Sequence, residues 1–403
     1  MFSFFITTTT EKKKTEGTTV GFCRTCECEV DIGRDLDPPE PVFIKGLELQ
    51  YPTMRGKMVW RTGETSRISC PKGMLADVGI RDADITCQSG TLFTVRSVGG
   101  YFSESMHSRN FLCTDYRLIS ADVQITTTPC GNGAGQLRNI GFTTVEGTFI
   151  PYIRACYNRN TDSAIYTNHT IRGIAIQYAI REDKRTTFKK SGTEQASEGS
   201  YKQKNQKERL EKLLGSDQAR RFINSNSYLE RGHLTPHADG IFPAWRWATY
   251  SLINAVPMWK AVNNGNWGAV EDEIRKMAER LQENVLIFTG AYDILTLPKA
   301  NGAQASITLE ERATEVPKWL WKIIVSPSTD SGIAFITNND PFRTFEPVKL
   351  CTDICREYNW YKEGFTSFAR GYTYCCRVRD LMNAIPAIPN DAAVSRVLRY
   401  SST

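Results

Sequence analysis

The sequence lacks a long apolar run, a large excess of either charge and an evident signal peptide. None of its 403 residues falls in a stretch of about 18 consecutive apolar residues, which argues against a transmembrane helix. The formal net charge of +6, from 50 basic and 44 acidic side chains, is too small to identify a polyanionic partner by itself. Residues 1 to 10, MFSFFITTTT, have no basic start and no small-residue cleavage site. None of these absences argues against a folded protein, and 403 residues are enough for two domains.

The chain is rich in cysteine. The twelve cysteines are Cys23, Cys26, Cys28, Cys70, Cys87, Cys113, Cys130, Cys156, Cys351, Cys355, Cys375 and Cys376. An even number at wide spacings is typical of a disulfide framework in an oxidising compartment. The first three resemble half of a zinc knuckle, but no second half lies nearby, and the last four lack Cys-x-x-Cys spacing. We therefore expect disulfides rather than zinc, and a secreted glycoprotein, since Asn168-His169-Thr170 is a glycosylation sequon.

Composition divides the chain into three parts. Residues 1 to 37 are polar, end in DLDPPEP and are expected to form a tail and linker. Residues 38 to 125 contain short β-branched or alternating runs such as VFIKGLELQY, KMVWRTG and TLFTVRSV, separated by turn residues, which predicts a small all-β module held by disulfides. Residues 126 to 403 are expected to form a larger α+β domain.

Within this larger domain, one helix and one basic segment stand out. An apolar stripe recurs at steps of three and four, which predicts a helix that starts at or just before Trp267 and is capped by nearby asparagines. The stripe consists of Trp267, Val270, Ile274, Met277, Ala278 and Leu281. Residues 182 to 208 form the most polar stretch, with seven Lys or Arg. It is expected to be a solvated loop that runs into a helix, and it is also able to contact phosphates.

The segment YLERGHLTPHAD, residues 228 to 239, contains two of the four histidines. Two histidines four residues apart suit a metal on a helix, but Gly232 and Pro236 argue against a helix here, so His233 and His237 make a poor zinc site. Further along, NAVPMWKAVNNGNWGAVE places amides before a helix that carries Glu271. An amide oxygen is a hard, neutral ligand that suits Mg²⁺ together with water. Taken singly, Asn263 and Asn264 are better explained by helix capping than by metal binding.

Taken together, these residues resemble the DNA/RNA non-specific endonucleases of the ββα-metal, or His-Me finger, superfamily. The motifs that carry the resemblance are Arg231-Gly232-His233 at a strand end, the turn Asn254-Ala255-Val256-Pro257, and Asn263-Asn264-Gly265-Asn266-Trp267 followed by Glu271. CGNGAGQLRNIGF, CTDICREYNW and GYTYCC are similar to the secreted arthropod branch, which includes gut double-stranded-RNA nucleases. The resemblance covers residues from about 38 to 390. For residues 126 to 403 it implies a ββα-metal nuclease fold with a central mixed sheet flanked by helices.

The resemblance also implies a role for each matching residue. His233 would be the general base, and Asn263 would be the single protein ligand of Mg²⁺, with Mn²⁺ as the alternative ion. Arg231 would help to position phosphate, Glu271 would accept hydrogen bonds from the ion's water, and Asn254 would brace the site. His237 would be structural or contact the substrate. An acid precedes Arg231 as in the family, but it is Glu230 in place of Asp, and the family's further arginine would be Arg172 or Arg181.

These residue types suit hydrolysis of a phosphodiester, which needs a base for water and positive charge at the phosphate. We therefore expect a metal-dependent, sugar-non-specific endonuclease whose substrates are DNA, RNA or both, double-stranded RNA among them, and whose products carry 5′-phosphate ends. The alternative is a secreted nucleic-acid-binding relative with impaired catalysis. A disulfide-rich interaction protein would account for residues 38 to 125 alone. Strand preference, disulfide connectivity and oligomeric state are not predicted, and no membrane partner is expected.

Overall fold

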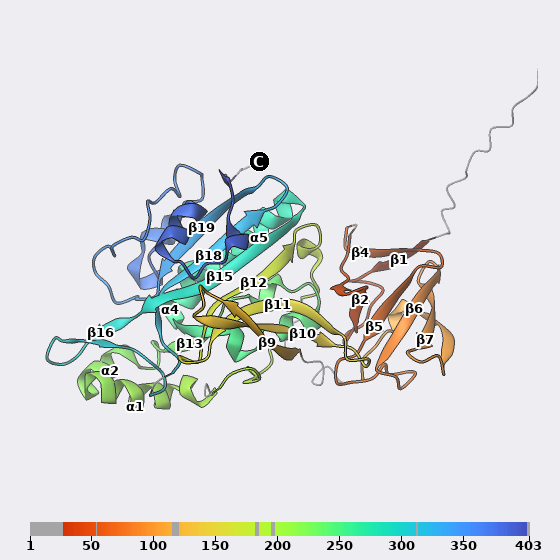
Figure 1. Ribbon diagram of the computed structural model, residues 1–403, viewed down its shortest axis with the longest axis horizontal. Coiled ribbons are helices and arrows are strands. Elements are labelled where there is room, and N and C mark those ends of the chain that lie inside the picture. Colours follow the sequence, from red (N-terminus) through yellow and green to blue (C-terminus); the bar gives the residue numbers. More distant parts are fainter. Residues whose placement is uncertain are drawn as a thin grey trace, which may run out of the picture.

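The computed structural model describes residues 27–53, 55–114, 121–181, 185–194, 198–311 and 313–400, which form two β-rich regions lying side by side (Figure 1). Cys23, Cys26 and residues 1–26 of the predicted tail lie outside the described residues. Within the described part of the chain, no helix is long and apolar enough to cross a membrane.

The described residues of the N-terminal β module form eight strands. They are β1 (Glu27–Asp31), β2 (Val42–Lys45), β3 (Glu48–Leu49), β4 (Lys57–Arg61), β5 (Thr65–Ser69), β6 (Asp82–Ser89), β7 (Leu92–Ser97) and β8 (Ser103–His107). Six form an antiparallel sheet in the order β3-β2-β5-β6-β7-β8, and β1 pairs with β4. Disulfides Cys28–Cys87 and Cys70–Cys113 cross-link the module, and the first joins β1 to β6. The disulfide-linked all-β module is therefore present.

Two predicted boundaries need correction. The tail was expected to extend to residue 37, but β1 lies inside that range and its alternate residues Cys28 and Val30 are fully buried, so residues 27–37 belong to the module. The module was expected to end at residue 125, but β9 (Asp122–Cys130) already belongs to the second sheet. Both strands were missed because their sequences are largely polar. Strand β1 has one buried face, and β9 has no buried face.

The larger region is built on a nine-stranded sheet. Its strand order is β20-β19-β18-β15-β12-β11-β10-β9, with the two-residue β21 beside β19. After β9, the strands are β10 (Gly135–Thr143), β11 (Phe149–Asn158), β12 (Ser163–Arg172), β15 (Asn284–Ile294), β18 (Pro317–Ser326), β19 (Ser331–Asn338), β20 (Thr373–Cys376) and β21 (Arg396–Val397). All neighbours are antiparallel except β19 and β21, so the sheet is mixed only through this last, parallel pair.

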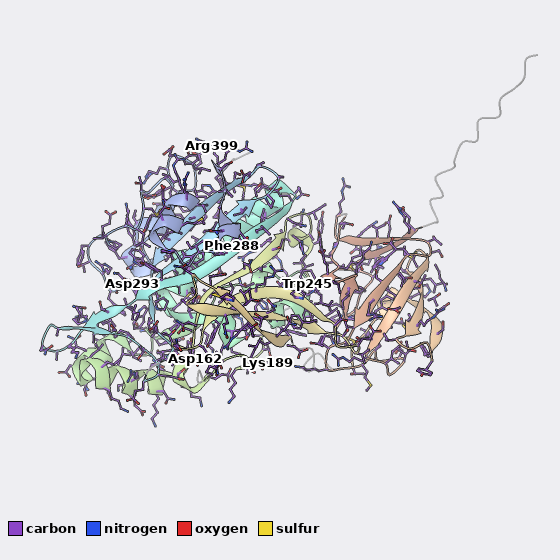
Figure 2. All side chains as sticks on the ribbon, viewed as in Figure 1. Asp162, Lys189, Trp245, Phe288, Asp293 and Arg399 are labelled. Atoms are coloured by element: carbon purple, nitrogen blue, oxygen red, sulfur yellow. A yellow bond between two sulfur atoms is a disulfide. The ribbon has the colours of Figure 1, made fainter. Side chains whose placement is uncertain are left out.

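Helices cover both faces of this sheet. The α-helices are α1 (Gln203–Leu214), α2 (Ser216–Phe222), α3 (Pro243–Ala248), α4 (Lys260–Val262), α5 (Gly268–Leu281) and α6 (Val378–Ala384). Adjacent residues of a strand point to opposite faces. Accordingly Ile287 of β15 packs in one cluster with Ile274 of α5, while Phe288 (labelled in Figure 2) packs in another with Leu381 of α6. The α+β class is confirmed.

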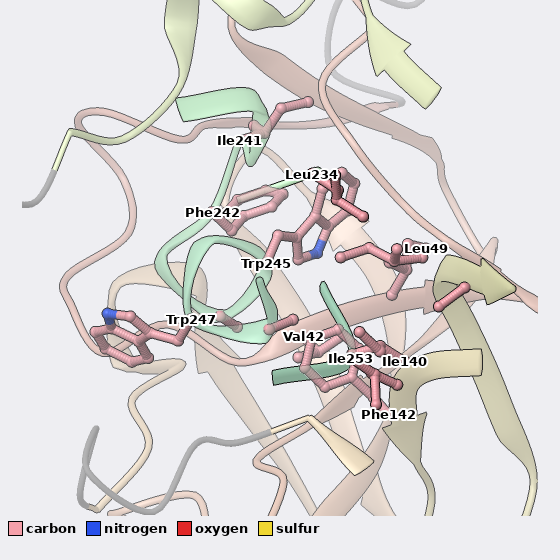
Figure 3. Close-up of a cluster of buried hydrophobic side chains, with 14 of the residues drawn as sticks. Val42, Leu49, Ile140, Phe142, Leu234, Ile241, Phe242, Trp245, Trp247 and Ile253 are labelled. Atoms are coloured by element: carbon pink, nitrogen blue, oxygen red, sulfur yellow. The ribbon is translucent and has the colours of Figure 1, made fainter. Parts of the chain in front are cut away.

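The two regions share one apolar core. Val42 and Leu49 of the module lie beside Ile140, Phe142 and Trp245 of the larger region (Figure 3). The Phe43 and Phe242 rings are 5.8 Å apart, and Arg67 forms an ion pair with Glu146. Burial of apolar surface at this junction favours a fixed arrangement of the two regions.

A two-strand-and-helix unit carries most of the conspicuous motif residues. Strands β13 (Leu229–His233) and β14 (Ala255–Trp259) pair antiparallel, and α4, the π-helical turn η7 (Asn263–Trp267) and α5 follow directly. The Arg-Gly-His motif ends a strand, as expected. Asn254 ends a short 3-10 turn and the next residues begin β14, so the expected turn at Asn254–Pro257 is a strand instead. Helix α5 begins at Gly268 with Trp267 as its N-cap, close to the expected start, but α4 and η7 precede it directly. The helical segment as a whole therefore starts at Lys260 and bends at Gly265, whose φ and ψ are −100° and −120°.

The remaining cysteine and glycosylation predictions have clear outcomes. Disulfides also join Cys130 to Cys156, Cys351 to Cys376 and Cys355 to Cys375, so all ten cysteines of the described residues are paired and the zinc alternative fails for them. Asn168, the residue of the sequon, lies within β12 between two paired strands, and its Oδ1 is buried. This placement speaks against a glycan at Asn168.

Candidate active site

The end of β13 and the kinked helix border a cavity of about 510 Å³. Its wall is polar and carries several charges of both signs. The lining residues are Arg185, His233, Pro236, His237, Ala238, Tyr250, Asn263, Asn264, Gly265, Gly268, Ala269, Glu271, Asp272, Arg275 and Arg370. The cavity thus brings together three of the predicted site residues, His233, Asn263 and Glu271.

His233 is the last residue of β13, and its ring packs against Phe188 and Tyr250, each with a centroid distance of 4.8 Å. Gly232 precedes it because a Cβ there would lie 2.2 Å from Sδ of Met258. Nε2 of His233 is buried and has no partner among the described residues, so Nδ1 is the nitrogen able to face the cavity. Burial, with the charges of His237 and Arg185, lowers the pKa of His233 to about 3. The imidazole is therefore neutral at neutral pH, and one ring nitrogen keeps a lone pair that can accept a hydrogen bond.

Asn263 lies inside the helical segment, with φ and ψ of −56° and −47°, while Trp259 occupies the N-cap position. Capping of a helix N-terminus therefore does not account for Asn263. Its Nδ2 donates to Oε2 of Glu230 at 2.8 Å, and Nδ2 of Asn264 donates to the same oxygen at 3.0 Å. Because a carboxylate only accepts hydrogen bonds, this contact fixes the amide orientation and directs Oδ1 of Asn263 away from Glu230.

Glu271 lies on the first turn of α5 and also lines the cavity, although the bend at Gly265 separates it from Asn263. Burial raises the pKa of the Glu271 carboxyl, and the charges of Lys322 and Arg275 partly offset this effect. A cation in the cavity would favour the ionised form. The Asn263 amide and the Glu271 carboxylate are both hard oxygen donors, so the donor set fits a hydrated divalent ion such as Mg²⁺.

Within the described ranges, no group of three or more His, Cys, Asp or Glu side chains could hold a metal ion. A site enclosed by protein ligands, of the structural zinc kind, is therefore not found in this part of the chain. An ion with one protein ligand and water at its other positions needs no such group.

Asn254 is fully buried and does not line the cavity. Its Oδ1 accepts from the backbone N–H of Thr235 at 2.9 Å, and its Nδ2 donates to the backbone oxygens of Thr235 and Thr249, also at 2.9 Å. These bonds fix the loop that follows His233. The hydrogen bonds of Asn254 therefore fit a residue that braces the site.

Arg231 is not brought to the cavity. Its guanidinium lies over the rings of Phe188 and Tyr201, at 5.3 and 5.5 Å from their centroids. Phe188 in turn contacts the His233 ring. This placement fits a residue that supports His233 through Phe188 better than one that touches phosphate.

A second cavity, of about 630 Å³, adjoins the first and is lined by five basic and two acidic side chains. The two share Arg185, His237, Ala238, Asp272 and Arg275. Arg181 lines the second cavity together with Arg246 and Lys276. Arg172 instead stacks on Tyr51 of the β module at 4.5 Å and lines a separate cavity. Of the two candidate arginines, only Arg181 is therefore near the site.

Sequence reasoning missed Arg185 and Arg275 as site residues. Arg275 follows Glu271 by four positions on a helix, a spacing that places both on one face and could have identified it. Its guanidinium donates to Oδ1 of the buried Asp239 at 2.9 Å and pairs with Asp272. Oδ2 of Asp239 contacts Nε2 of His169 at 2.8 Å. This network holds Arg275 rigidly in the cavity wall.

Lys322, on β18 of the central sheet, contacts the backbone next to His233. It is almost fully buried on β18, and its Nζ donates to the backbone oxygen of Leu234 at 3.0 Å and to Oγ1 of Thr289 at 2.6 Å. Burial lowers the pKa of this ammonium, and the charges of Glu271 and Asp239 act in the opposite direction. The contact with Leu234 fixes the backbone directly after His233.

Comparison with known proteins gives a consistent picture. The sequence model of the family described as DNA/RNA non-specific endonuclease matches residues 133–381. A salivary endonuclease of Lutzomyia longipalpis is 30% identical over 269 residues, which are 65% of this chain and 64% of that protein, so the chain spans just under two thirds of this relative. Salivary protein Tsal2A of Glossina morsitans morsitans is 27% identical over 94% of this chain and 98% of its own. A salivary endonuclease of Culex quinquefasciatus is 24% identical over 89% of each chain.

Proposed function

The chain belongs to the DNA/RNA non-specific endonuclease family, and from this premise we propose that it is a secreted, metal-dependent endonuclease that hydrolyses phosphodiester bonds in DNA and RNA. His233 acts as the general base, and Asn263 is the protein ligand of Mg²⁺. The observation that carries the proposal is the convergence of His233, Asn263 and Glu271 on one cavity from a strand end and two parts of a bent helix.

The residues of the chain divide the chemistry among them. Neutral His233 takes a proton at Nδ1 from the attacking water, whose oxygen bonds to phosphorus while the bond to the 3′ oxygen breaks. The 3′ oxygen leaves as an alkoxide and takes a proton from water in the cavity, so the products are a 3′-hydroxyl and a 5′-phosphate. Arg185 and Arg275 bind phosphate oxygens at the border of the two cavities. Glu271 accepts hydrogen bonds from water in the cavity. When bound at Asn263, the ion supplies positive charge for the phosphate and for the departing oxygen.

The substrate class follows from the charge of the cavities. Arg181, Arg185, Arg246 and Arg275 would contact phosphates, which carry no base sequence. Cleavage without sequence preference is therefore expected, and double-stranded RNA is one of the substrates to test. Binding should weaken as salt rises, because each phosphate contact releases counterions.

Secretion is supported by two observations. The ten cysteines of the described residues form five disulfides, which persist in oxidising compartments. Relatives of the chain are described as salivary proteins.

Plasmid cleavage tests the proposed function. The wild-type protein should cut plasmid DNA with Mg²⁺ and stop when a chelator is added. His233→Ala should lose about 10²- to 10⁴-fold in rate, since removal of a general base has this effect, while its melting temperature stays close to that of the wild type. His107→Ala, which removes the histidine of β8 in the module, is the matched control and should cleave normally.

The alternative is a relative that binds nucleic acid with impaired catalysis. A wild-type protein that retains duplex DNA on a gel but leaves it intact with Mg²⁺ and with Mn²⁺ would favour this alternative. Full activity in His233→Ala would instead assign the base to another residue.

A further inference from the structure

The cross-linked segment over residues 351–376 reaches the active-site cavity. Disulfides Cys351–Cys376 and Cys355–Cys375 close it, and it contains the 3-10 turns η8 (Glu363–Thr366) and η9 (Phe368–Arg370). Arg370, the last residue of η9, lines the same cavity as His233 and Asn263. It is the one arginine of the cavity wall that comes from this C-terminal part of the sequence.

The segment is seated directly on the bend of the helix. A Cβ at Gly265 would lie 2.6 Å from the backbone oxygen of Arg370, so the close approach depends on glycine. The neighbouring Asn266 is almost fully buried, and its Nδ2 donates to the backbone oxygens of Gly364 and Gly371, both at 2.7 Å. These two bonds tie both ends of the stretch that contains Arg370 to the helix.

Arg370 and Arg275 both line the cavity, but their side chains differ in their carboxylate partners. Arg275 is bound by Asp239 and Asp272, whereas Arg370 is exposed and forms no ion pair in the part of the chain that the structure describes. Its guanidinium passes over Gly364, where a Cβ would lie 3.6 Å from Nε. An exposed guanidinium held at its backbone but without a carboxylate is suited to bind an anion that enters the cavity.

We propose that Arg370 contacts the substrate, binding a phosphate next to the one that is cleaved, and that Asn266 positions it. The inference rests on the proposed function for the identity of the substrate. Arg185 and Arg275 hold the substrate from one part of the cavity wall, and Arg370 adds a contact from the C-terminal segment. The guanidinium donates two parallel N–H bonds to one phosphate, which a lysine cannot reproduce.

Binding without metal measures this contact separately from cleavage. The affinity for a fluorescein-labelled DNA duplex is measured by anisotropy in chelator, at several salt concentrations. Arg370→Ala should weaken binding about tenfold near physiological salt and reduce the slope of log affinity against log salt by about one. Arg370→Lys should recover the slope but only part of the affinity. Arg379→Ala, an exposed arginine of α6 outside the cavity, is the control with the same loss of charge.

Asn266→Asp tests the positioning role. The substitution replaces a donor by an acceptor against two carbonyl oxygens, so it should displace Arg370 and weaken binding. In the Arg370→Ala background the same substitution should cause no further loss of affinity. A merely structural Asn266 would give additive losses in the double variant, which would overturn the positioning role.

The outcomes separate this inference from the proposed function. Arg370→Ala with the affinity, salt slope and cleavage rate of Arg379→Ala would overturn the contact. A wild-type protein that binds with the expected slope but does not cleave would contradict the proposed function, and the binding data would still decide the role of Arg370.

Discussion

At the scale of single residues, the contacts of Glu230 show what this longer acid does in the place where the family has Asp. The longer side chain reaches the amides of both Asn263 and Asn264 with one oxygen. Asn263 therefore presents its Oδ1 to the cavity without a second orienting residue. The acid at this position has a defined role in the site although it is neither the base nor the ligand.

The histidines of the cavity make stability depend on pH. Burial lowers the pKa of His237 to about 4, with help from Arg246 and Arg185, and that of His233 to about 3. In the unfolded chain both pKa values return to about 6.5. Between these limits the unfolded state binds more protons, so the free energy of unfolding should decrease as pH falls from 7 to 5.

His237→Gln should reduce this pH dependence. Between pH 7 and 5, the free energy of unfolding should decrease less in the variant than in the wild type, and the difference should be on the order of 1 kcal/mol. This value is kept small because His237 is partly exposed and solvent screens its charge. Chemical denaturation at the two pH values measures this difference. Parallel pH dependences for wild type and variant would show that His237 does not titrate as its burial requires.

The sequence identified some site residues and not others for a physical reason. His233, Asn263 and Glu271 lie in local motifs whose spacing is visible in the chain. Arg185 and Arg370 reach the cavity only because distant segments fold against β13 and the bent helix. No local sequence pattern indicates that the segments of Arg185 and Arg370 come close to this cavity.

At the scale of elements, the bent helix is the main difference between expectation and structure. The apolar stripe from Trp267 correctly predicted α5, since Trp267, Val270 and Ile274 are almost fully buried. The earlier start at Lys260 was missed because asparagine and glycine are poor helix formers and favour caps. The π-helical turn η7 accommodates them and directs Asn263 towards the cavity, as is common for such turns at functional sites.

Gly265→Ala should damage both stability and activity. The added Cβ would meet the backbone oxygen of Arg370 at 2.6 Å, and backbone cannot yield as a flexible side chain does. A loss of about 1 to 3 kcal/mol in unfolding free energy is expected from overpacking, together with a reduced cleavage rate. Gly73→Ala, where the nearest atom would be 3.6 Å away, is the control and should melt near the wild-type temperature. A Gly265→Ala protein with unchanged melting and activity would contradict the tight seating of η9.

At the scale of the whole molecule, disulfides and a shared apolar core hold two β-rich regions together. The alternation of apolar residues predicted the module, but its docking depends on contacts such as Phe43 with Phe242, which are 199 positions apart in the sequence. Disulfide formation was predictable from the number of cysteines. Their connectivity was not, because pairing depends on which strands become neighbours.

Thiol titration tests the disulfide framework. In denatured, unreduced protein, the ten cysteines of the five disulfides should not react, so at most two of the twelve should be titrated. Reduction should then expose all twelve and lower the melting temperature, since loss of native disulfides typically costs about 2 to 5 kcal/mol. Titration of most cysteines before reduction would contradict the framework.

The most direct test of the central claim is a metal titration of plasmid cleavage by Asn263→Ala and Asn263→Asp. If Asn263 is the protein ligand, the alanine variant should lose cleavage at Mg²⁺ concentrations that saturate the wild type, yet still bind DNA through the arginines of the two cavities. The aspartate variant should regain affinity for the ion, because a carboxylate is the stronger ligand. Asn226→Ala, at an exposed turn, is the control and should cleave normally. Wild-type dependence on Mg²⁺ in Asn263→Ala would contradict the assignment of Asn263 as the metal ligand.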